Sequence, residues 1–355
     1  MRVLMLILCL SLCACAQTPP ATGLTVPKGF KVSTYAEVPA ARSLSLAPDG
    51  TLYVGTRGDK VYVVTDSNHD GKADKVEVLA DGLNRPNGVA FHKGSLYVAE
   101  ISRILRYDKP VPGAKPAVVT ADLPDKTHHG WKFIRFGPDG KLYVPVGAPC
   151  NVCEVEDPFA ALLSMNPDGS GRQVYARGIR NTVGFDWQPT TGHLWFTDNG
   201  RDWLGDDKPP CELNLAPKPG LHFGFPYRWG DNQPDPQFGK GGKGLTFTPS
   251  AHGFQAHTAP LGMRFYQGKM FPQSYRNQIF VAQHGSWNRS KKVGYRVMLI
   301  KVEGSKVVSA TPFLTGFLHG EQVSGRPVDV EVMADGSMLV SDDHAGKIYR
   351  VTYDE

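Results

Sequence analysis

The sequence lacks the features that mark a membrane-spanning, nucleic-acid-binding or disordered protein. After the first residues, no apolar run is long enough to cross a bilayer. Lys and Arg are scattered and the formal net charge is only +5, so no basic stripe is present that could follow a phosphate backbone. Hydrophobic residues make up 41% of the chain, which is too many for disorder. We therefore expect a folded domain that does not bind nucleic acid.

Cysteine is scarce in the part of the chain that should fold. Three of the six cysteines fall within the first 15 residues, which leaves Cys150, Cys153 and Cys211. In an oxidising compartment a disulfide between Cys150 and Cys153 is the default. Glu154 stands where a covalent c-type haem would need histidine, so haem attachment is excluded. Zinc would have three thiols and no obvious fourth ligand, and it remains a minor alternative.

The N-terminal stretch MRVLMLILCLSLCACAQ predicts an export signal. It has one Arg followed by an apolar run that is too short for a retained membrane span. The run ends on the letters LCAC at residues 12–15, which resemble a bacterial lipobox with Cys15 as the lipidated residue. A plain signal peptide cut near Ala16 is the alternative. Ala16 after the lipidated cysteine resembles the pattern of outer-membrane lipoproteins.

This organisation predicts one domain held at a membrane by its lipid alone. Residues 1–15 form the predicted signal peptide and lipobox, 16–25 a short linker, and 26–355 the folded domain. We expect the protein in the periplasm or cell envelope, anchored most readily in the outer membrane.

One phrase recurs along the folded part and sets the fold. It reads SLSLAPDGTLYVG, GVAFHKGSLYVAE, IRFGPDGKLYVPV, VGFDWQPTTGHLWFTD and VDVEVMADGSMLVSD, each of them strand, tight turn, strand. The turn glycines Gly50, Gly94, Gly140 and Gly192 lie 44, 46 and 52 residues apart, the size of a four-stranded propeller blade. A looser copy, MRFYQGKMFPQSYRNQIFVAQHG, fills the gap before Gly336. These repeats predict an all-β, six-bladed β-propeller, and the lone strand FKVSTYA near residue 30 should join the last blade and close the ring.

Polar residues stand at the start of several repeats, where loops converge on one end of a propeller's central channel. His129 precedes KFIRFGPDG, Arg180 and Asn181 precede TVGFDW, and Arg326 precedes PVDVEV. Because all of them occupy the same place in their repeats, we expect them to meet at the axis.

An ordered set of motifs gives these residues a more specific meaning. HGWKFIRFGPDGKLYV, GIRN, DNGRD, CELN, HFGFPY and GRPVD follow one another along the chain. From about residue 26 to the C-terminus, the chain resembles the pyrroloquinoline quinone (PQQ) dependent sugar dehydrogenases. The forms TDNGRDWLGDD and GSWNR are most similar to the L-sorbosone dehydrogenase-like branch. The resemblance implies PQQ and Ca²⁺ as cofactors, a sugar or sugar-derived aldehyde as substrate, and a cytochrome or a quinone as external electron acceptor.

The resemblance also implies roles for the blade-start residues. His129 matches the family's catalytic base, a neutral imidazole that accepts a hydroxyl proton as hydride leaves the sugar carbon. His128 takes the place of a neighbouring acidic residue. Arg180 and Asn181 match the pair that lies against the quinone, where a guanidinium stabilises charge on oxygen.

A tricarboxylate cofactor requires further cations. Arg326 fits GRPVD, but Val328 stands where the soluble glucose dehydrogenases carry a second Arg. Arg289 or Lys291 is expected to take over that contact. Two weaker cofactor contacts are expected in LNRPNG before the second blade: Arg85 and Asn87.

Calcium ligands are expected in two places. The Gly200-Arg201 step matches the position where the family uses two backbone carbonyls to hold a catalytic Ca²⁺, which acts as a Lewis acid. Nearby acidic residues are candidates for a structural Ca²⁺: Asp206, Asp207 and Glu212.

A third calcium site is suggested without any family. The loop DSNHDGKAD spaces oxygen ligands at alternate positions around Gly71, as in the first half of an EF-hand loop. Its candidate ligands are Asp66, Asn68, Asp70, Lys72 and Asp74. The loop lacks flanking helices and the twelfth-position Glu, and a solvated Asn/Asp/Gly turn is the alternative. We favour calcium as a structural brace.

Two other functions stay open. A calcium-dependent lactonase of the gluconolactonase type is also six-bladed and would use a Glu, Asn and Asp set on a central metal. A non-enzymatic propeller that binds a partner would take up no cofactor. GIRN and DNGRD favour the dehydrogenase, because a lactonase does not need arginines for a tricarboxylate.

Overall fold

The computed structural model describes residues 23–354, and it contains strands, loops and one short 3-10 helix, η1 (Gln273–Tyr275). Within these residues no helix is long and apolar enough to cross a membrane. The predicted signal peptide, the lipobox with Cys15 and most of the predicted linker lie outside the described residues.

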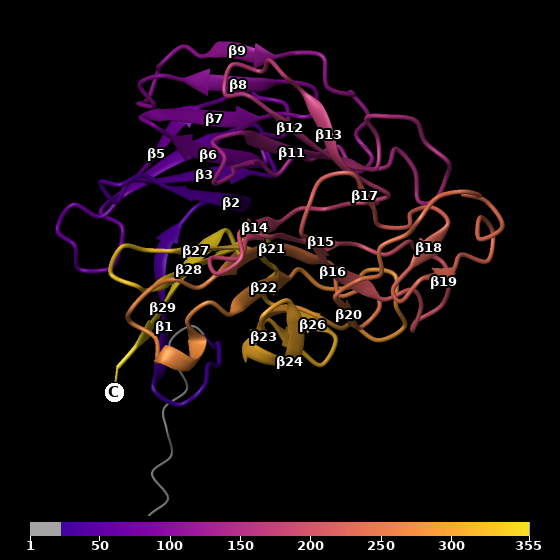
Figure 1. Ribbon diagram of the computed structural model, residues 1–355. Helices are drawn as coiled ribbons and strands as arrows, with labels where there is room; N and C mark the ends of the chain where they lie inside the picture. Colours follow the sequence, from indigo (N-terminus) through magenta and orange to yellow (C-terminus); the bar gives the residue numbers. More distant parts are fainter. Residues whose placement is uncertain (1–22, 355) are drawn as a thin grey trace, which may run out of the picture.

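Six sheets of four or five strands surround a common axis and confirm the predicted six-bladed β-propeller (Figure 1). Blade 1 consists of β2 (Ala41–Leu46), β3 (Leu52–Thr56), β4 (Val61–Thr65) and β5 (Lys75–Ala80). Blade 2 consists of β6 (Gly88–His92), β7 (Ser95–Ala99), β8 (Ile104–Tyr107) and β9 (Ala117–Thr120). Blade 3 consists of β10 (Arg135–Phe136), β11 (Leu142–Val146), β12 (Ala161–Met165), β13 (Gln173–Arg177) and the added β17 (Leu221–His222).

The remaining blades follow in chain order. Blade 4 consists of β14 (Phe185–Trp187), β15 (Leu194–Asp198), β16 (Cys211–Ala216) and β20 (His252–Phe254). Blade 5 consists of β21 (Pro260–Phe265), β22 (Ile279–Gln283), β23 (Arg296–Glu303) and β24 (Lys306–Leu314), and it contains the looser repeat. Blade 6 consists of β27 (Pro327–Val332), β28 (Met338–Asp342), β29 (Lys347–Tyr353) and β1 (Phe30–Glu37). Two small hairpins lie outside the blades: β18 (Arg228–Trp229) with β19 (Gln233–Pro234), and β25 (Leu318–His319) with β26 (Gln322–Val323).

The second strand of most blades carries the core. Every residue of β3, β11, β15, β22 and β28 is buried, because neighbouring sheets pack against both faces of these strands. Burying one large aliphatic or aromatic side chain contributes about 1.5–3 kcal/mol, so these short apolar strands supply much of the stabilisation. The repeated phrase of the sequence corresponds to the first two strands of each blade.

The first and last strands of the fold lie side by side and close the ring, as predicted (Figure 1). β1 pairs antiparallel with β29, from Phe30 opposite Tyr353 to Glu37 opposite Lys347. The Phe30 ring packs edge-to-face against Phe271 at 4.8 Å and Phe313 at 5.0 Å between ring centroids. This closure joins two distant parts of the chain into one blade and leaves the axis enclosed.

The strand predicted directly after His129 is much shorter than expected. Only Arg135 and Phe136 of KFIRFGPDG form β10. The preceding Lys132 is buried and its ammonium donates to the carbonyl of Gly130 at 2.7 Å, within the same segment. The carbonyl of Lys132 accepts from the Asn87 side chain at 2.8 Å, so polar groups of this segment are satisfied outside a strand ladder.

Ion pairs join the innermost strands at the end of the channel away from the blade starts. Arg264 lies 3.1 Å from Glu331, and Arg135 lies 3.6 Å from Glu331 and 3.3 Å from Asp186. These four side chains come from four different blades. They cross-link the inner strands around a cavity of about 280 Å³ at this end, whereas the blade-start loops gather at the opposite end.

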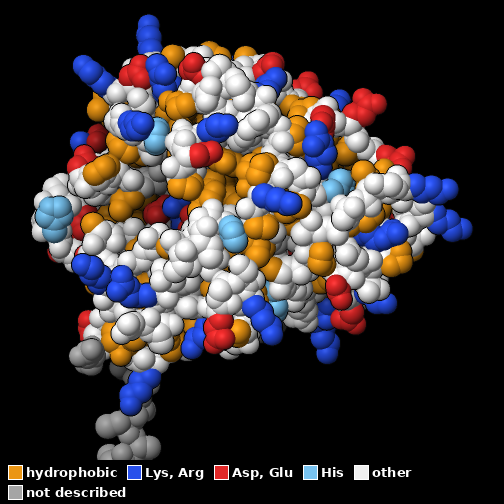
Figure 2. All heavy atoms as spheres, viewed as in Figure 1, with side chains coloured by type: hydrophobic (Ala, Val, Ile, Leu, Met, Phe, Trp, Pro, Cys, Tyr) orange, Lys and Arg blue, Asp and Glu red, His pale blue; other side chains and the backbone are white. Residues whose placement is uncertain are grey.

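The face of the molecule drawn in Figure 2 carries Lys and Arg side chains interspersed with Asp and Glu. No continuous basic stripe is visible on this face, in keeping with the scattered charges of the sequence.

Candidate active site

The blade-start loops bring four of the predicted residues into one cavity. This first axial cavity, of about 210 Å³, is lined by His129, Arg180, Asn181 and Gly200 among others. A second axial cavity, of about 290 Å³, shares His129 and Asn181 with the first and extends to Arg85 and other side chains of blades 1, 2 and 5. His129 therefore lies in the wall that the two axial cavities share.

His129 is held in one orientation and one protonation state. Its Nδ1 atom lies 2.8 Å from the carbonyl oxygen of Ala148. Burial, followed by the charges of Arg180 and His128, lowers the pKa of His129 to about 2, so the imidazole is neutral at ordinary pH. A neutral ring that donates from Nδ1 keeps the Nε2 lone pair free, which is what a general base needs.

The backbone at His129 is also unusual. Its φ of 50° lies in the left-handed region, which costs free energy for a residue other than glycine and is common at functional sites. Gly147 makes this conformation possible: a Cβ there would lie 2.5 Å from the His129 Cβ and 2.7 Å from its carbonyl oxygen. The glycine lets the two segments approach closely.

Arg180 is almost fully buried, with 4% of its surface exposed. Its guanidinium donates to the carbonyl of Asn151 at 2.8 Å and to the Asn151 side-chain oxygen at 2.9 Å. It also donates to the carbonyl of Asn199 at 3.1 Å and to Asp202 at 3.2 Å. This fixes a planar cation in the wall of the first axial cavity.

The carboxylate of Asp198, at the end of β15, anchors the backbone of the GIRN loop at residues 178–181. Its carboxylate accepts the backbone N–H groups of Arg180 at 2.9 Å and of Asn181 at 2.6 Å. Burial raises the pKa of Asp198 to about 6.

No role was expected for Asn151, which lies inside the loop closed by the Cys150–Cys153 disulfide; this predicted disulfide is present in the structure. Besides its contacts to Arg180, its side-chain oxygen accepts the backbone N–H of Asp202 at 2.8 Å. The disulfide loop thus joins the GIRN and DNGRD segments. Cys211 is a buried free cysteine, and burial raises the pKa of its thiol.

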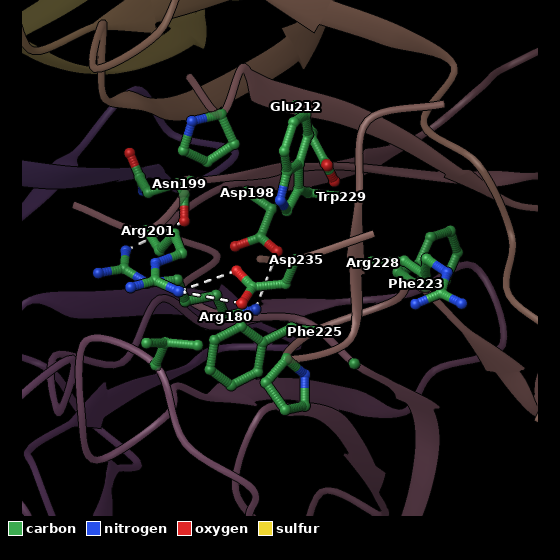
Figure 3. Close-up of a pocket in the computed structure, with 15 residues that line it drawn as sticks. Arg180, Asp198, Asn199, Arg201, Glu212, Phe223, Phe225, Arg228, Trp229 and Asp235 are labelled. Atoms are coloured by element: carbon green, nitrogen blue, oxygen red, sulfur yellow. Dashed lines mark hydrogen bonds and ion pairs between the residues drawn. The ribbon is translucent and has the colours of Figure 1, made fainter. Parts of the chain in front are cut away.

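A small cavity of about 30 Å³ lies behind Arg180 and is lined by acidic and aromatic side chains (Figure 3). Burial raises the pKa of Glu212 in its wall to about 8, and Arg201 pairs with Asp235 at 2.9 Å. The side-chain oxygen of Asn199 is buried here without a hydrogen-bond partner among the described residues. Asn199 and Gly200 line both this cavity and the first axial cavity. An unpaired amide oxygen beside the Gly200-Arg201 step is the hard oxygen donor that Ca²⁺ prefers.

Two predicted cofactor arginines do not line either axial cavity. The Arg289 guanidinium lies 3.2 Å from the carboxylate of Asp207 and also donates to the carbonyl of Asp206. Arg326 donates to the carbonyls of His284 at 3.1 Å and Gly285 at 2.9 Å. Both guanidiniums are bound by other protein groups. Arg326 contacts the backbone of His284, which lines the second axial cavity, whereas Arg289 contacts a surface loop away from both cavities.

Asn87 and His128, which were also expected to contact the cofactor, line neither axial cavity. Asn87 is fully buried; its side-chain oxygen accepts from Arg42 and its amide donates to the carbonyl of Lys132 at 2.8 Å. It therefore orients Arg42. His128 is exposed and stands edge-on to His129, with 4.1 Å between ring centroids.

The structure does not bring together the three acidic residues expected to hold a structural calcium near DNGRD. Asp206 and Asp207 face Arg289 and Ser290 at the surface. Glu212 is buried between Asn214 and the backbone N–H of Gly230 instead. Among residues 23–354, no three His, Cys, Asp or Glu side chains form a group that could hold a metal by themselves.

The loop with EF-hand-like spacing folds around its own carboxylates. Asp66 accepts the N–H of Gly71 at 2.9 Å, and Asp74 accepts the N–H groups of Ser67 and Asn68 at 2.6 and 3.2 Å. The second carboxylate oxygen of Asp66 is buried and has no partner among the described residues. The side chain of Asn68 donates to Asp74 and Asp70, and the N–H of Lys72 to Asp70. Calcium at this loop stays a prediction.

Sequence reasoning missed the side chains that complete the second axial cavity. Arg42 pairs with Asp343 at 2.7 Å, and His284 lies 2.8 Å from the other oxygen of that carboxylate. Trp131 lies under the Arg42 guanidinium, 4.5 Å from it. Arg42 directly precedes the repeated phrase SLSLAPDG of the first blade, so its place near a blade start was a signal that could have found it.

Two exposed tryptophans flank the first axial cavity. Trp203 and Trp287 are 68% and 65% exposed, and their rings meet edge-to-face at 5.4 Å between centroids. Trp287 lines the cavity itself. Apolar rings left open beside a cavity indicate a ligand-binding rim.

Several solved structures have the same propeller. The PQQ domain of pyranose dehydrogenase from Coprinopsis cinerea, in its holo form, has a TM-score of 0.78 with 19% identity, covering 94% of this chain and 98% of that one. A calcium structure of a family AA12 carbohydrate-active enzyme from Trichoderma reesei has a TM-score of 0.80, with the same identity and coverage. The PQQ-bound aldose sugar dehydrogenase from Streptomyces coelicolor has a TM-score of 0.67 with 20% identity, covering 93% of this chain and 100% of that one. At these identities the likeness shows the fold.

Sequence relatives extend this picture. An aldose sugar dehydrogenase of Escherichia coli (strain K12) is 25% identical over 188 residues, which span 52% of this chain and 45% of that protein. An uncharacterized protein of Borreliella burgdorferi is 36% identical over 353 residues, which span 94% of this chain and 91% of that protein. One family model matches residues 21–352, the whole propeller, and the chain therefore belongs to the family described as a domain of unknown function (DUF7133).

Proposed function

We propose that the protein is an oxidoreductase that removes a hydride from a sugar or a sugar-derived aldehyde, with PQQ and Ca²⁺ as cofactors. One observation carries the proposal. A neutral His129, with its Nε2 lone pair free, shares a cavity with the buried cation Arg180, the amide of Asn181 and the Gly200 step. A base beside a fixed cation is the arrangement that removal of a hydride and a proton requires.

The residues present fit the proposed cofactors. The buried Arg180 guanidinium and the Asn181 side chain offer donors to quinone or carboxylate oxygens. The partnerless Asn199 oxygen and the main-chain carbonyls at Gly200-Arg201 offer oxygen donors to Ca²⁺. When bound, the quinone polarised by Ca²⁺ supplies the hydride acceptor.

The chain's own residues would then perform three tasks. His129 takes the proton of the substrate hydroxyl on Nε2 while the Ala148 carbonyl holds Nδ1. Arg180, locked by Asn151 and Asp202, stabilises negative charge that develops on oxygen. The exposed ring of Trp287 covers one side of a sugar at the rim.

The cellular setting belongs to the proposal. Export and lipidation at Cys15 would place the enzyme in a bacterial cell envelope, anchored in the outer membrane. Electrons would leave to an external acceptor, a cytochrome or a quinone, because the sequence has no haem attachment motif.

Reconstitution tests the proposal. Purified protein is incubated with PQQ and Ca²⁺, freed of excess cofactor, and given an aldose together with a dye acceptor. We expect retained quinone absorbance and dye reduction that depends on both cofactor and sugar. A protein that retains no PQQ would refute the dehydrogenase function.

A further inference from the structure

Three arginines surround one tryptophan at the second axial cavity. The guanidinium carbons of Arg42, Arg57 and Arg85 lie 4.5, 5.6 and 5.7 Å from the Trp131 ring centroid. We call Arg42, Arg57, Arg85 and Trp131 the arginine cluster. Its members come from the start of blade 1, the end of β3, the start of blade 2 and the start of blade 3, so four separate segments converge to build it.

The cluster carries more positive than negative charge. Its one carboxylate is Asp343, which is fully buried, pairs with Arg42 at 2.7 Å and is also bound by His284. Arg57 reaches that carboxylate only at 3.9 Å. The Arg85 guanidinium forms no ion pair with any residue in 23–354, and it lies over the Trp131 ring. Among the described residues, Arg85 therefore has no counter-ion, and Arg57 has only the distant carboxylate of Asp343.

The excess charge faces the proposed reaction centre. Arg42, Arg85 and Trp131 line the second axial cavity, and His129 lines the same cavity. Arg42 is fixed in place by Asp343 on one side and Asn87 on the other, whereas Arg57 and Arg85 are exposed. A sugar that presents its reacting hydroxyl to His129 from this cavity points its remaining groups at free guanidinium donors.

Neutral sugars do not need this arrangement. Sugar hydroxyls are bound well by neutral amides and by carboxylates, whereas planar guanidinium forks match carboxylates in geometry and charge. Holding like charges together around one ring costs free energy unless an anion joins them. An anionic ligand removes that cost.

We infer that the arginine cluster selects a sugar substrate that carries a carboxylate. Arg57 and Arg85 bind that carboxylate, and Asp343 orients Arg42. The inference rests on the proposed function, since it takes His129 as the reacting end of the site. It reassigns Arg85, which the sequence placed as a weaker cofactor contact, to the substrate, and it makes no statement about the groups that hold the cofactor carboxylates.

Calorimetry with sugars that are not oxidised at C1 tests the inference without turnover. Methyl galactopyranosiduronate and methyl galactopyranoside are titrated into the protein loaded with PQQ and Ca²⁺. We expect the charged glycoside to bind about tenfold more tightly, the effect of one charge-assisted contact. In Arg85→Gln the preference should fall to about threefold or less. In the double variant that carries both Arg57→Gln and Arg85→Gln it should vanish. Arg276→Gln, an exposed arginine that lines neither cavity, should keep the wild-type preference.

The outcomes separate the possible failures. Equal binding of the two glycosides by the wild type would overturn the inference. An Arg85→Gln protein that loses PQQ affinity and keeps its preference would show that the cluster binds the cofactor, which also overturns it. If galactose 6-phosphate binds more tightly than the uronate, the cluster is a phosphate site and the carboxylate assignment is wrong. If the protein takes up no PQQ, the proposed function fails, and the same titration on the protein without PQQ still decides whether the cluster prefers an anionic sugar.

Discussion

The Nδ1 atom of His129 lies 2.8 Å from the carbonyl oxygen of Ala148, and this contact sets the tautomer of the imidazole. Because a carbonyl only accepts, the proton is on Nδ1 and the lone pair is on Nε2. The protein therefore presents a base, and not a donor, to both axial cavities.

Replacing His129 should separate cofactor uptake from chemistry. His129→Asn suits the left-handed backbone and keeps a polar side chain. We expect near-normal PQQ retention and a loss of about 10²- to 10⁴-fold in kcat for dye reduction. His128→Asn is the matched control, since His128 is exposed and should lose far less. Near-normal turnover by His129→Asn would show that another group takes the proton.

The depressed pKa of His129 predicts how stability depends on pH. The unfolded chain protonates this imidazole below its ordinary value of 6.5, whereas the folded protein does so only at about 2. The unfolded state thus binds more protons between these values, and this group lowers stability as the pH falls through that window, by up to about 1.4 kcal/mol per pH unit. Urea unfolding at pH 7 and pH 5 should show a smaller drop for His129→Asn than for the wild type. An identical drop would mean that His129 is not held neutral.

Gly147 should be needed for its lack of a side chain. Gly147→Ala places a methyl group 2.5 Å from the His129 Cβ, so the His129 segment must move. We expect a folded protein, by circular dichroism, that has lost most dye reduction. In Gly58→Ala the new Cβ has its nearest neighbour at 3.8 Å, which makes that variant the control. Full activity in Gly147→Ala would show that the approach of the two segments is not required.

Asn151 should matter through Arg180. Asn151→Ala removes the acceptor shared by the Arg180 guanidinium and the Asp202 N–H, at a cost of about 1–3 kcal/mol for unsatisfied buried donors. We expect weaker PQQ retention in equilibrium dialysis, by roughly 5- to 100-fold. Asn166→Ala, on an exposed turn of blade 3, is the comparison variant and should bind as the wild type does. Unchanged retention in Asn151→Ala would separate Arg180 from cofactor binding.

The loop at residues 66–74 should bind calcium through Asp66, whose second carboxylate oxygen is buried without a partner among the described residues. Calcium at 100 times its Kd should raise the free energy of unfolding by about 2.7 kcal/mol. Thermal unfolding with and without Ca²⁺ measures this, and Asp66→Asn should lose the part of the shift that this loop supplies. Asp108→Asn, on an exposed turn, should keep it. A shift of equal size in Asp66→Asn would leave the loop as a solvated turn.

The fold could be predicted because each blade repeats the same strand, turn and strand pattern in the sequence. The turn glycines at blade spacing and the buried second strands depend on local sequence, and the closing of β1 onto β29 followed from a lone strand without a local partner. The shortening of β10 could not be predicted in this way. Lys132 is polar in the sequence and buried in the fold, and only the three-dimensional surroundings show that its ammonium is satisfied by Gly130.

The site was predictable where position in the repeat decided it. His129, Arg180 and Asn181 stand at equivalent blade starts and do meet. Arg326 was placed by the same repeat position and Arg289 by residue type, but their guanidiniums are bound by carbonyls and a carboxylate from other segments. No sequence spacing shows which partner a long side chain will find.

The proposed function depends most on PQQ binding in the first axial cavity, beside the neutral His129 and the Arg180 guanidinium. Titration of PQQ into the calcium-loaded protein, followed by quinone absorbance or calorimetry, tests this directly. We predict saturation at one PQQ per chain, and a large loss of affinity in Arg180→Gln with retained fold. Absence of saturable binding in the wild type, or binding of equal strength in Arg180→Gln, would contradict the account.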